Sequence, residues 1–106
     1  MAKELKTDLM KISSGRVEKD DYRSSVQRGY ITRCARSLLI LLKENDEVEV
    51  RAVGTTAVAN TLKTFIAVER MLKEENKSIK IYEPVYVDEK IDDREISVCS
   101  VKVTIA

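Results

Sequence analysis

Residues 47–54 read Glu47-Val48-Glu49-Val50-Arg51-Ala52-Val53-Gly54, and this stretch decides the fold. Val48, Val50 and Ala52 alternate with charged residues, which is the pattern of a strand with one buried face. Gly54 ends the strand, and Thr55 is predicted as the N-cap of a helix that continues to about residue 75. A strand that leads through a glycine into a long helix predicts a domain built from both kinds of element.

The helix predicted over residues 55–75 carries small or apolar side chains on two sides. One face is formed by Val58, Leu62, Phe65, Ile66 and Leu72. The other face is formed by Ala57, Thr61, Thr64, Val68 and Met71. A helix with two such faces often lies either between its own sheet and a partner or deep in a core. This pattern leaves open a purely structural role as an interaction module.

Toward the N-terminus, the sequence predicts a short strand over residues 9–12, a loop over 16–27 and a helix over about 30–44. The apolar residues of this helix recur at helical spacing and are expected in the core: Ile31, Cys34, Ala35, Leu38, Leu41 and Leu42. Each helix is expected to begin just after a glycine, at Gly29 and Gly54. A helix start attracts anions through its free N–H groups and its dipole.

Toward the C-terminus, residues 79–87 and 96–105 alternate and predict two strands of a long antiparallel hairpin. Residues 88–95 are predicted as the charged loop that joins them, and a change of parity predicts a bulge near residues 98–100. The predicted fold is α+β, a single-domain two-layer sandwich with the order β-α-β-α-β-β. Residues 1–8 are assigned to a charged N-terminal segment and 9–106 to the domain.

Composition excludes several classes of function. The chain has 106 residues, 43% of them hydrophobic and 35% charged, which is typical of one globular domain. It has no histidine, so the commonest general base is absent. Its only two cysteines are far apart in the sequence, which argues against a zinc site and favours a reducing compartment. The longest aliphatic run, residues 38–42, is too short to span a membrane. We predict no enzyme activity, no cofactor, no metal site and no membrane contact.

The charges are unevenly distributed along the chain. Residues 22–43 contain five basic side chains and no acidic one, namely Arg23, Arg28, Arg33, Arg36 and Lys43. A solvated helix face would also explain this pattern. Arginine, however, favours an anion-binding surface, because its planar guanidinium matches phosphate and stacks on bases.

Three segments of the chain resemble the Alba family of small dimeric DNA- and RNA-binding proteins of archaea and eukaryotes. They are Gly29-Tyr30-Ile31, residues 47–54 and the 88–95 hairpin. Their fold is similar to the C-terminal domain of bacterial translation initiation factor three. The resemblance, with the basic segment, implies a nucleic-acid-binding set: Arg23, Arg28, Gly29, Tyr30, Arg33, Arg36, Arg51, Thr55, Lys90 and Arg94. Tyr30 is equally explained as a core residue. The chain departs from the family in residues 24–27 and in its net acidic hairpin.

The function predicted at this point is non-enzymatic binding of a phosphate backbone, RNA preferred over DNA, through arginines at the helix N-termini. The partners would be RNA or DNA and a second chain, in a homodimer or a heterodimer with another Alba-type protein. The location would be cytoplasmic or nuclear. Three alternatives remain: a ribonucleoprotein subunit as in RNase P or MRP, a DNA-coating chromatin protein, and a small metal enzyme using Asp88, Asp92 and Asp93.

Overall fold

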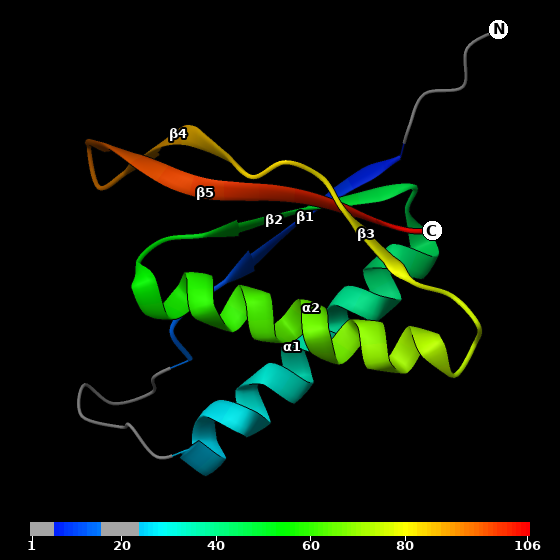
Figure 1. Cartoon of the computed structure of the whole chain (residues 1–106). Helices are drawn as coiled ribbons and strands as arrows, with labels where there is room; N and C mark the ends of the chain where they lie inside the picture. The colour runs from blue at the N-terminus through cyan, green and yellow to red at the C-terminus, as the bar shows by residue number, and fades with distance from the viewer. Residues whose placement is uncertain (1–5, 16–23) are drawn as a thin grey trace, which may run out of the picture.

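The computed structural model describes residues 6–15 and 24–106, which form two helices and a five-stranded mixed sheet. The elements are β1 (Thr7–Ile12), α1 (Ser24–Glu44), β2 (Glu47–Ala52), α2 (Thr55–Lys73), β3 (Ile79–Ile81), β4 (Val85–Ile91) and β5 (Arg94–Ile105). The strands make one layer, and the two helices cross each other on one face of it (Figure 1). The predicted α+β class is confirmed.

The long strand β5 organises the sheet. β2 pairs antiparallel with one edge of β5, and β1 pairs parallel with β2. β3 and β4 both pair antiparallel with the opposite edge, β3 with residues 103–105 and β4 with residues 94–100. β1 therefore forms one border of the sheet, and β3 and β4 together form the other.

The core lies between the helices and the facing side of the sheet. Val48 and Val103 are directly paired across β2 and β5, and both are completely buried. Leu38 of α1 and Val68 of α2 are equally buried in the same cluster. The alternation predicted for residues 47–52 is thus confirmed, because every second side chain of β2 contacts the helical layer.

Several predicted boundaries are wrong, each for a local reason. β1 includes Thr7 and Asp8, and α1 begins at Ser24, inside the predicted loop. The predicted strand 79–87 is divided, because Pro84 has no N–H to donate to β5. The predicted loop 88–95 is almost all strand, since Asp92 and Asp93 turn the chain with positive φ angles of 49° and 63°.

The bulge predicted near residues 98–100 is also wrong. β5 keeps a regular register through these residues with β4 on one side and β2 on the other. The change of parity arises because Val98 and Ser100 are buried on the open face of the sheet, whereas Val101 and Val103 are buried against the helices. One strand therefore buries different faces along its length.

Glu69 of α2 holds the edge strand β3 in place. Its carboxylate accepts hydrogen bonds from the N–H of Ile79, at 2.9 Å, and from the Ser78 hydroxyl, at 2.8 Å. The N–H of Ile79, followed by the Ser78 hydroxyl, lowers the pKa of this carboxyl below its ordinary value.

This geometry predicts acid sensitivity. A carboxyl with a lowered pKa adds stability above its unfolded pKa, and the stability is lost as the pH falls through the folded pKa. We therefore expect Glu69→Gln to reduce the loss of unfolding free energy between neutral and acidic pH, measured by urea denaturation. Glu44→Gln, which removes an exposed carboxylate from α1, is the control and should leave the pH profile unchanged. Identical profiles for Glu69→Gln and the wild type would contradict this role.

Candidate functional site

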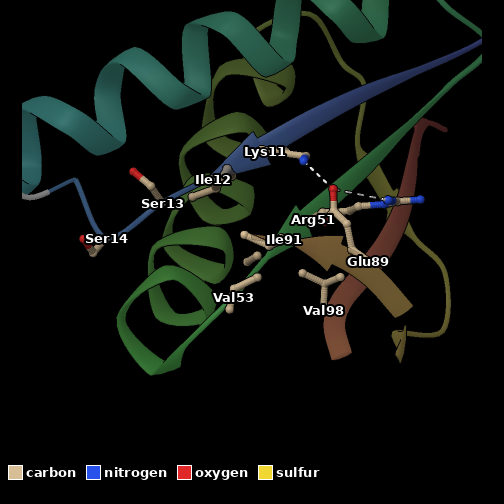
Figure 2. A pocket seen from close by; sticks show the side chains of 10 residues that line it. Lys11, Ile12, Ser13, Ser14, Arg51, Val53, Glu89, Ile91 and Val98 are labelled. Carbon is tan, nitrogen blue, oxygen red and sulfur yellow. Dashed lines mark hydrogen bonds and ion pairs between the residues drawn. The ribbon is translucent and has the colours of Figure 1, made fainter. Parts of the chain in front are cut away.

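A hollow of about 390 Å³ lies where the parallel strands β1 and β2 end (Figure 2). Apolar side chains form much of its wall, including Ile12, Ile91 and Val98. Lys11, Arg51 and Glu89 carry the charges of this hollow. The two cations come from neighbouring strands, because Lys11 and Arg51 are paired in the register of β1 and β2.

The charges of this hollow neutralise one another. Lys11 forms an ion pair with Oε1 of Glu89, and Nη1 of Arg51 lies 3.9 Å from the same oxygen. Nε of Arg51 donates to Glu49 at 2.7 Å, and this bond, with one from Ser100, lowers the pKa of Glu49. The network links β4 to β1 and β2 by side-chain contacts. Arg51 therefore lies on the open sheet face and is paired, and it is not free at the start of α2.

A row of arginines follows the solvent side of α1. Arg28, Arg33 and Arg36 are exposed, and within residues 6–15 and 24–106 none of them forms an ion pair. α1 already begins at Ser24, so Gly29 is an interior helical residue and Arg28 lies in the second turn. The predicted helix start at Gly29 is therefore wrong, and the free N–H groups of α1 lie earlier in the chain.

Tyr30 anchors the segment that follows β1. Its hydroxyl accepts a hydrogen bond from the N–H of Ser13 at 2.9 Å, and its half-buried ring packs against the core. The ring also lies against Gly15. This placement favours the core interpretation of Tyr30 over base stacking.

The other predicted contact residues lie apart. Gly54, and not Thr55, is the N-cap of α2, and no side chain caps this helix. Lys90 and Arg94 lie at the far end of the β4–β5 hairpin, opposite Glu95 and Ile91. Arg23 is outside the described residues. Arg28, Arg33 and Arg36 thus lie on the exposed side of α1, whereas Arg51, Thr55, Lys90 and Arg94 lie on other surfaces.

A third surface is an apolar groove between α2 and β3. Leu62, Ile66 and Ile81 are each about half exposed there, although all three are large aliphatic residues. The hollow between them is about 590 Å³ and is bordered by Glu69, Arg70 and Lys73. The apolar pattern of residues 55–75 was the signal for this surface, but the two predicted faces are not divided as expected. Phe65 and Leu72 of the first face are buried in the core, whereas Leu62 and Ile66 of the same face are exposed.

Two further properties bear on function. Within the described residues, no three His, Cys, Asp or Glu side chains are grouped so that they could hold a metal ion. Neither α1 nor α2 is long and apolar enough, over the part of the chain that is described, to cross a membrane.

These features define a small α+β domain that carries a neutralised charged hollow, an arginine row and an apolar groove on separate surfaces. Residues 27–106 match the model of a bacterial family described as stage V sporulation protein S, SpoVS, and the chain belongs to that family. A comparison with curated proteins gives no significant match.

The family match corrects the earlier identification. The chain is not an Alba protein, so the predicted Alba-type nucleic-acid binding, the ribonucleoprotein alternative and the chromatin alternative are wrong. A nuclear location is also wrong for a bacterial sporulation protein. The resemblance rested on an order of elements and a strand–glycine–helix block, which reflect packing rules of small α+β domains more than a particular ligand.

Proposed function

We propose that this chain takes part in spore formation as a non-catalytic protein that works by contact with another protein. The observation that carries this proposal is the family match over residues 27–106, because the family is described as a stage V sporulation protein. The surface that supports a protein contact is the apolar groove formed by α2 and β3.

The groove is better suited to a protein contact than the hollow at the ends of β1 and β2. The cations of the hollow, Lys11 and Arg51, are already paired with Glu89 and Glu49. In the groove, by contrast, Leu62 and Ile66 remain 59% and 55% exposed within a domain that has enough apolar residues to fill its core. Exposed apolar surface bordered by charges is typical of protein contact sites.

Deletion of the gene for a protein of this family in a spore-forming bacterium, followed by expression of the present chain, tests the proposal. We expect fewer heat-resistant spores from the deletion strain and recovery of the count when the wild-type gene is returned. Vegetative growth rate is the control, because a contact specific to sporulation should leave it unchanged. Equal spore counts from the deletion strain and its parent would contradict the proposed function.

A further inference from the structure

We propose that the hollow at the carboxyl ends of β1 and β2 binds a small organic anion, which takes the place of Glu89 between Lys11 and Arg51. The anion is a carboxylate or a phosphate monoester that carries an aliphatic body. This site lies apart from the α2–β3 groove, so it goes beyond the proposed function and does not rest on it. The features that carry it are unused donors on Arg51, an apolar wall beside them and a rim that the fold holds in place.

Arg51 has hydrogen-bond donors that no described residue uses. A guanidinium has five N–H donors, and here Nε donates to Glu49 at 2.7 Å. Nη1 lies 3.9 Å from Oε1 of Glu89, which is too far for a hydrogen bond, and neither Nη atom is hydrogen-bonded within the described part of the chain. No buried side-chain nitrogen or oxygen of the described residues lacks a partner, so the Nη atoms are accessible, and Arg51 lines the hollow. An oxyanion is the acceptor that best fits this planar group.

Lys11 places a second cation beside Arg51. The two residues are paired in the register of β1 and β2, and the Lys11 side chain is 60% exposed. Both cations converge on a single carboxylate oxygen, Oε1 of Glu89, as Figure 2 shows. The carboxylate or phosphate of a ligand presents two or more oxygens and can therefore contact both cations at once.

The balance of charge on this sheet face determines how an anion can bind. Its ion pairs join three cations and three carboxylates, namely Lys11, Arg51, Lys102, Glu47, Glu49 and Glu89. An anion added to this neutral network would meet repulsion from the carboxylates beside the cations. Binding therefore requires one of these carboxylates to withdraw.

Glu89 is the carboxylate that can withdraw. Glu49 lies on the inner strand β2 and is held both by Arg51 and by the hydroxyl of Ser100, which donates at 2.7 Å. Glu89 lies on β4, which together with residues 94–98 of β5 forms a two-stranded ribbon in the described part of the chain. A two-stranded ribbon is held less firmly than an inner strand. Rotation of the Glu89 side chain toward solvent would leave the place between the two cations free.

The wall of the hollow is apolar. Ile12, Val53, Ile91 and Val98 line it, and Figure 2 shows Val53, Ile91 and Val98 grouped beside the ion pairs. Its volume of about 390 Å³ is within the range of sites for small molecules. A bare inorganic ion would leave this wall exposed to water, so the ligand that fits carries an aliphatic body next to its anionic group.

The rim of the hollow is fixed by a buried amide. Ser13 and Ser14 line the hollow, and Nδ2 of Asn60 donates to the carbonyl oxygens of both, each at 3.1 Å. Asn60 is only 2% exposed, and the hydroxyl of Tyr30 accepts the N–H of Ser13 at 2.9 Å. The rim is therefore in place before a ligand arrives, which lowers the entropic cost of binding.

NMR titration of the purified full chain tests the site with four probes at constant ionic strength. Hexyl phosphate and hexanoate carry both an anionic group and an aliphatic body, and they should shift the amide signals of residues 11–14, 51–53 and 89–91. The tighter of the two identifies the ligand as a phosphate monoester or a carboxylate. Hexanol lacks the charge and inorganic phosphate lacks the body, so each should bind at least about 10-fold more weakly.

The exchange with Glu89 gives an unusual expectation, because removal of a charged lining residue should strengthen binding. Glu89→Gln should lower the dissociation constant of the tighter probe by about 5-fold, since the competing ion pair is gone. Asp88→Asn is the matched control. It changes the net charge equally, but Asp88 is exposed on the opposite face of β4 and should leave the affinity unchanged.

Substitution of the two cations tests their role. Lys11→Gln should weaken binding by about 5-fold, whereas Lys80→Gln, which removes an exposed lysine from β3, should not. Arg51→Lys keeps the charge but removes the planar group and should weaken binding by about 10-fold. The dispersion of the NMR spectrum shows whether each variant is folded.

The proposal would be overturned by the absence of localised shifts with both amphipathic probes, or by equally tight binding of hexanol or inorganic phosphate. Equal affinities of Glu89→Gln and Asp88→Asn, or unchanged binding by Lys11→Gln and Arg51→Lys, would also overturn it. These measurements use purified protein and a different surface, so their failure leaves the proposed function of the groove standing, and unchanged spore counts leave the anion site standing.

Discussion

Replacement of Leu38 by alanine is expected to lower the unfolding free energy by about 3 kcal/mol. Leu38 is fully buried on α1, in the cluster that joins both helices to the sheet. The substitution removes apolar contacts and leaves a cavity between two rigid layers, which relax only in part. For a domain with a total stability of about 5–15 kcal/mol, this is a large share.

Urea unfolding followed by circular dichroism measures this effect as a lower midpoint with an unchanged slope. Ile40→Ala is the matched control, because Ile40 lies on the same helix and is mostly exposed. We expect the control to cost less than about 1 kcal/mol. Equal losses for the two variants would contradict the placement of Leu38 in the core.

Replacement of Gly15 by alanine is expected to cost about 2 kcal/mol, although the residue lies in a connecting segment. Gly15 has φ of +72°, a region that residues with a Cβ rarely adopt. A Cβ built there would lie 2.5 Å from Cδ2 of Tyr30, so the ring would have to move. The same ring carries the hydroxyl that binds the N–H of Ser13, and its displacement would loosen the end of β1.

A glycine in a different setting serves as the control for this prediction. Gly29 lies within α1, and a Cβ there meets nothing within 4 Å, so Gly29→Ala should raise the stability by about 0.5–1 kcal/mol. In a Tyr30→Ala background, Gly15→Ala should cost less than in the wild type. Thermal unfolding of the four variants checks both statements, and a neutral Gly15→Ala would contradict the packing of Tyr30 on Gly15.

The parts of the fold that the sequence predicts are those set by local periodicity. Val48, Val50 and Ala52 alternate over a whole strand, and Cys34, Ala35 and Leu38 recur at helical spacing, so burial of these residues follows from geometry within one element. The start of α1 at Ser24 was missed because residues 24–29 carry little hydrophobic periodicity. The turn at Asp92 and Asp93 lacks the glycine that usually marks a two-residue hairpin.

The candidate site was less predictable, because it depends on contacts between distant segments. The sequence around Arg51 suggested that its guanidinium is available to bind phosphate. In the fold, however, Glu89, which lies 38 positions later on another strand, is placed against it. The closer partner, Glu49 at 2.7 Å, lies two residues away on the same face of β2, but nothing within residues 47–54 shows the contact with Glu89. Conversely, the apolar residues on two sides of α2 did indicate an exposed apolar surface, because the sheet and α1 bury Phe65 and Leu72 but leave Leu62 and Ile66 exposed.

The central claim is that the α2–β3 groove is the surface through which this chain serves sporulation. The most direct measurement is the count of heat-resistant spores from the deletion strain carrying either Ile66→Glu or Ile40→Glu at equal protein level. We expect Ile66→Glu to leave the count as low as in the deletion strain and Ile40→Glu to restore it. Full restoration by Ile66→Glu would contradict the claim.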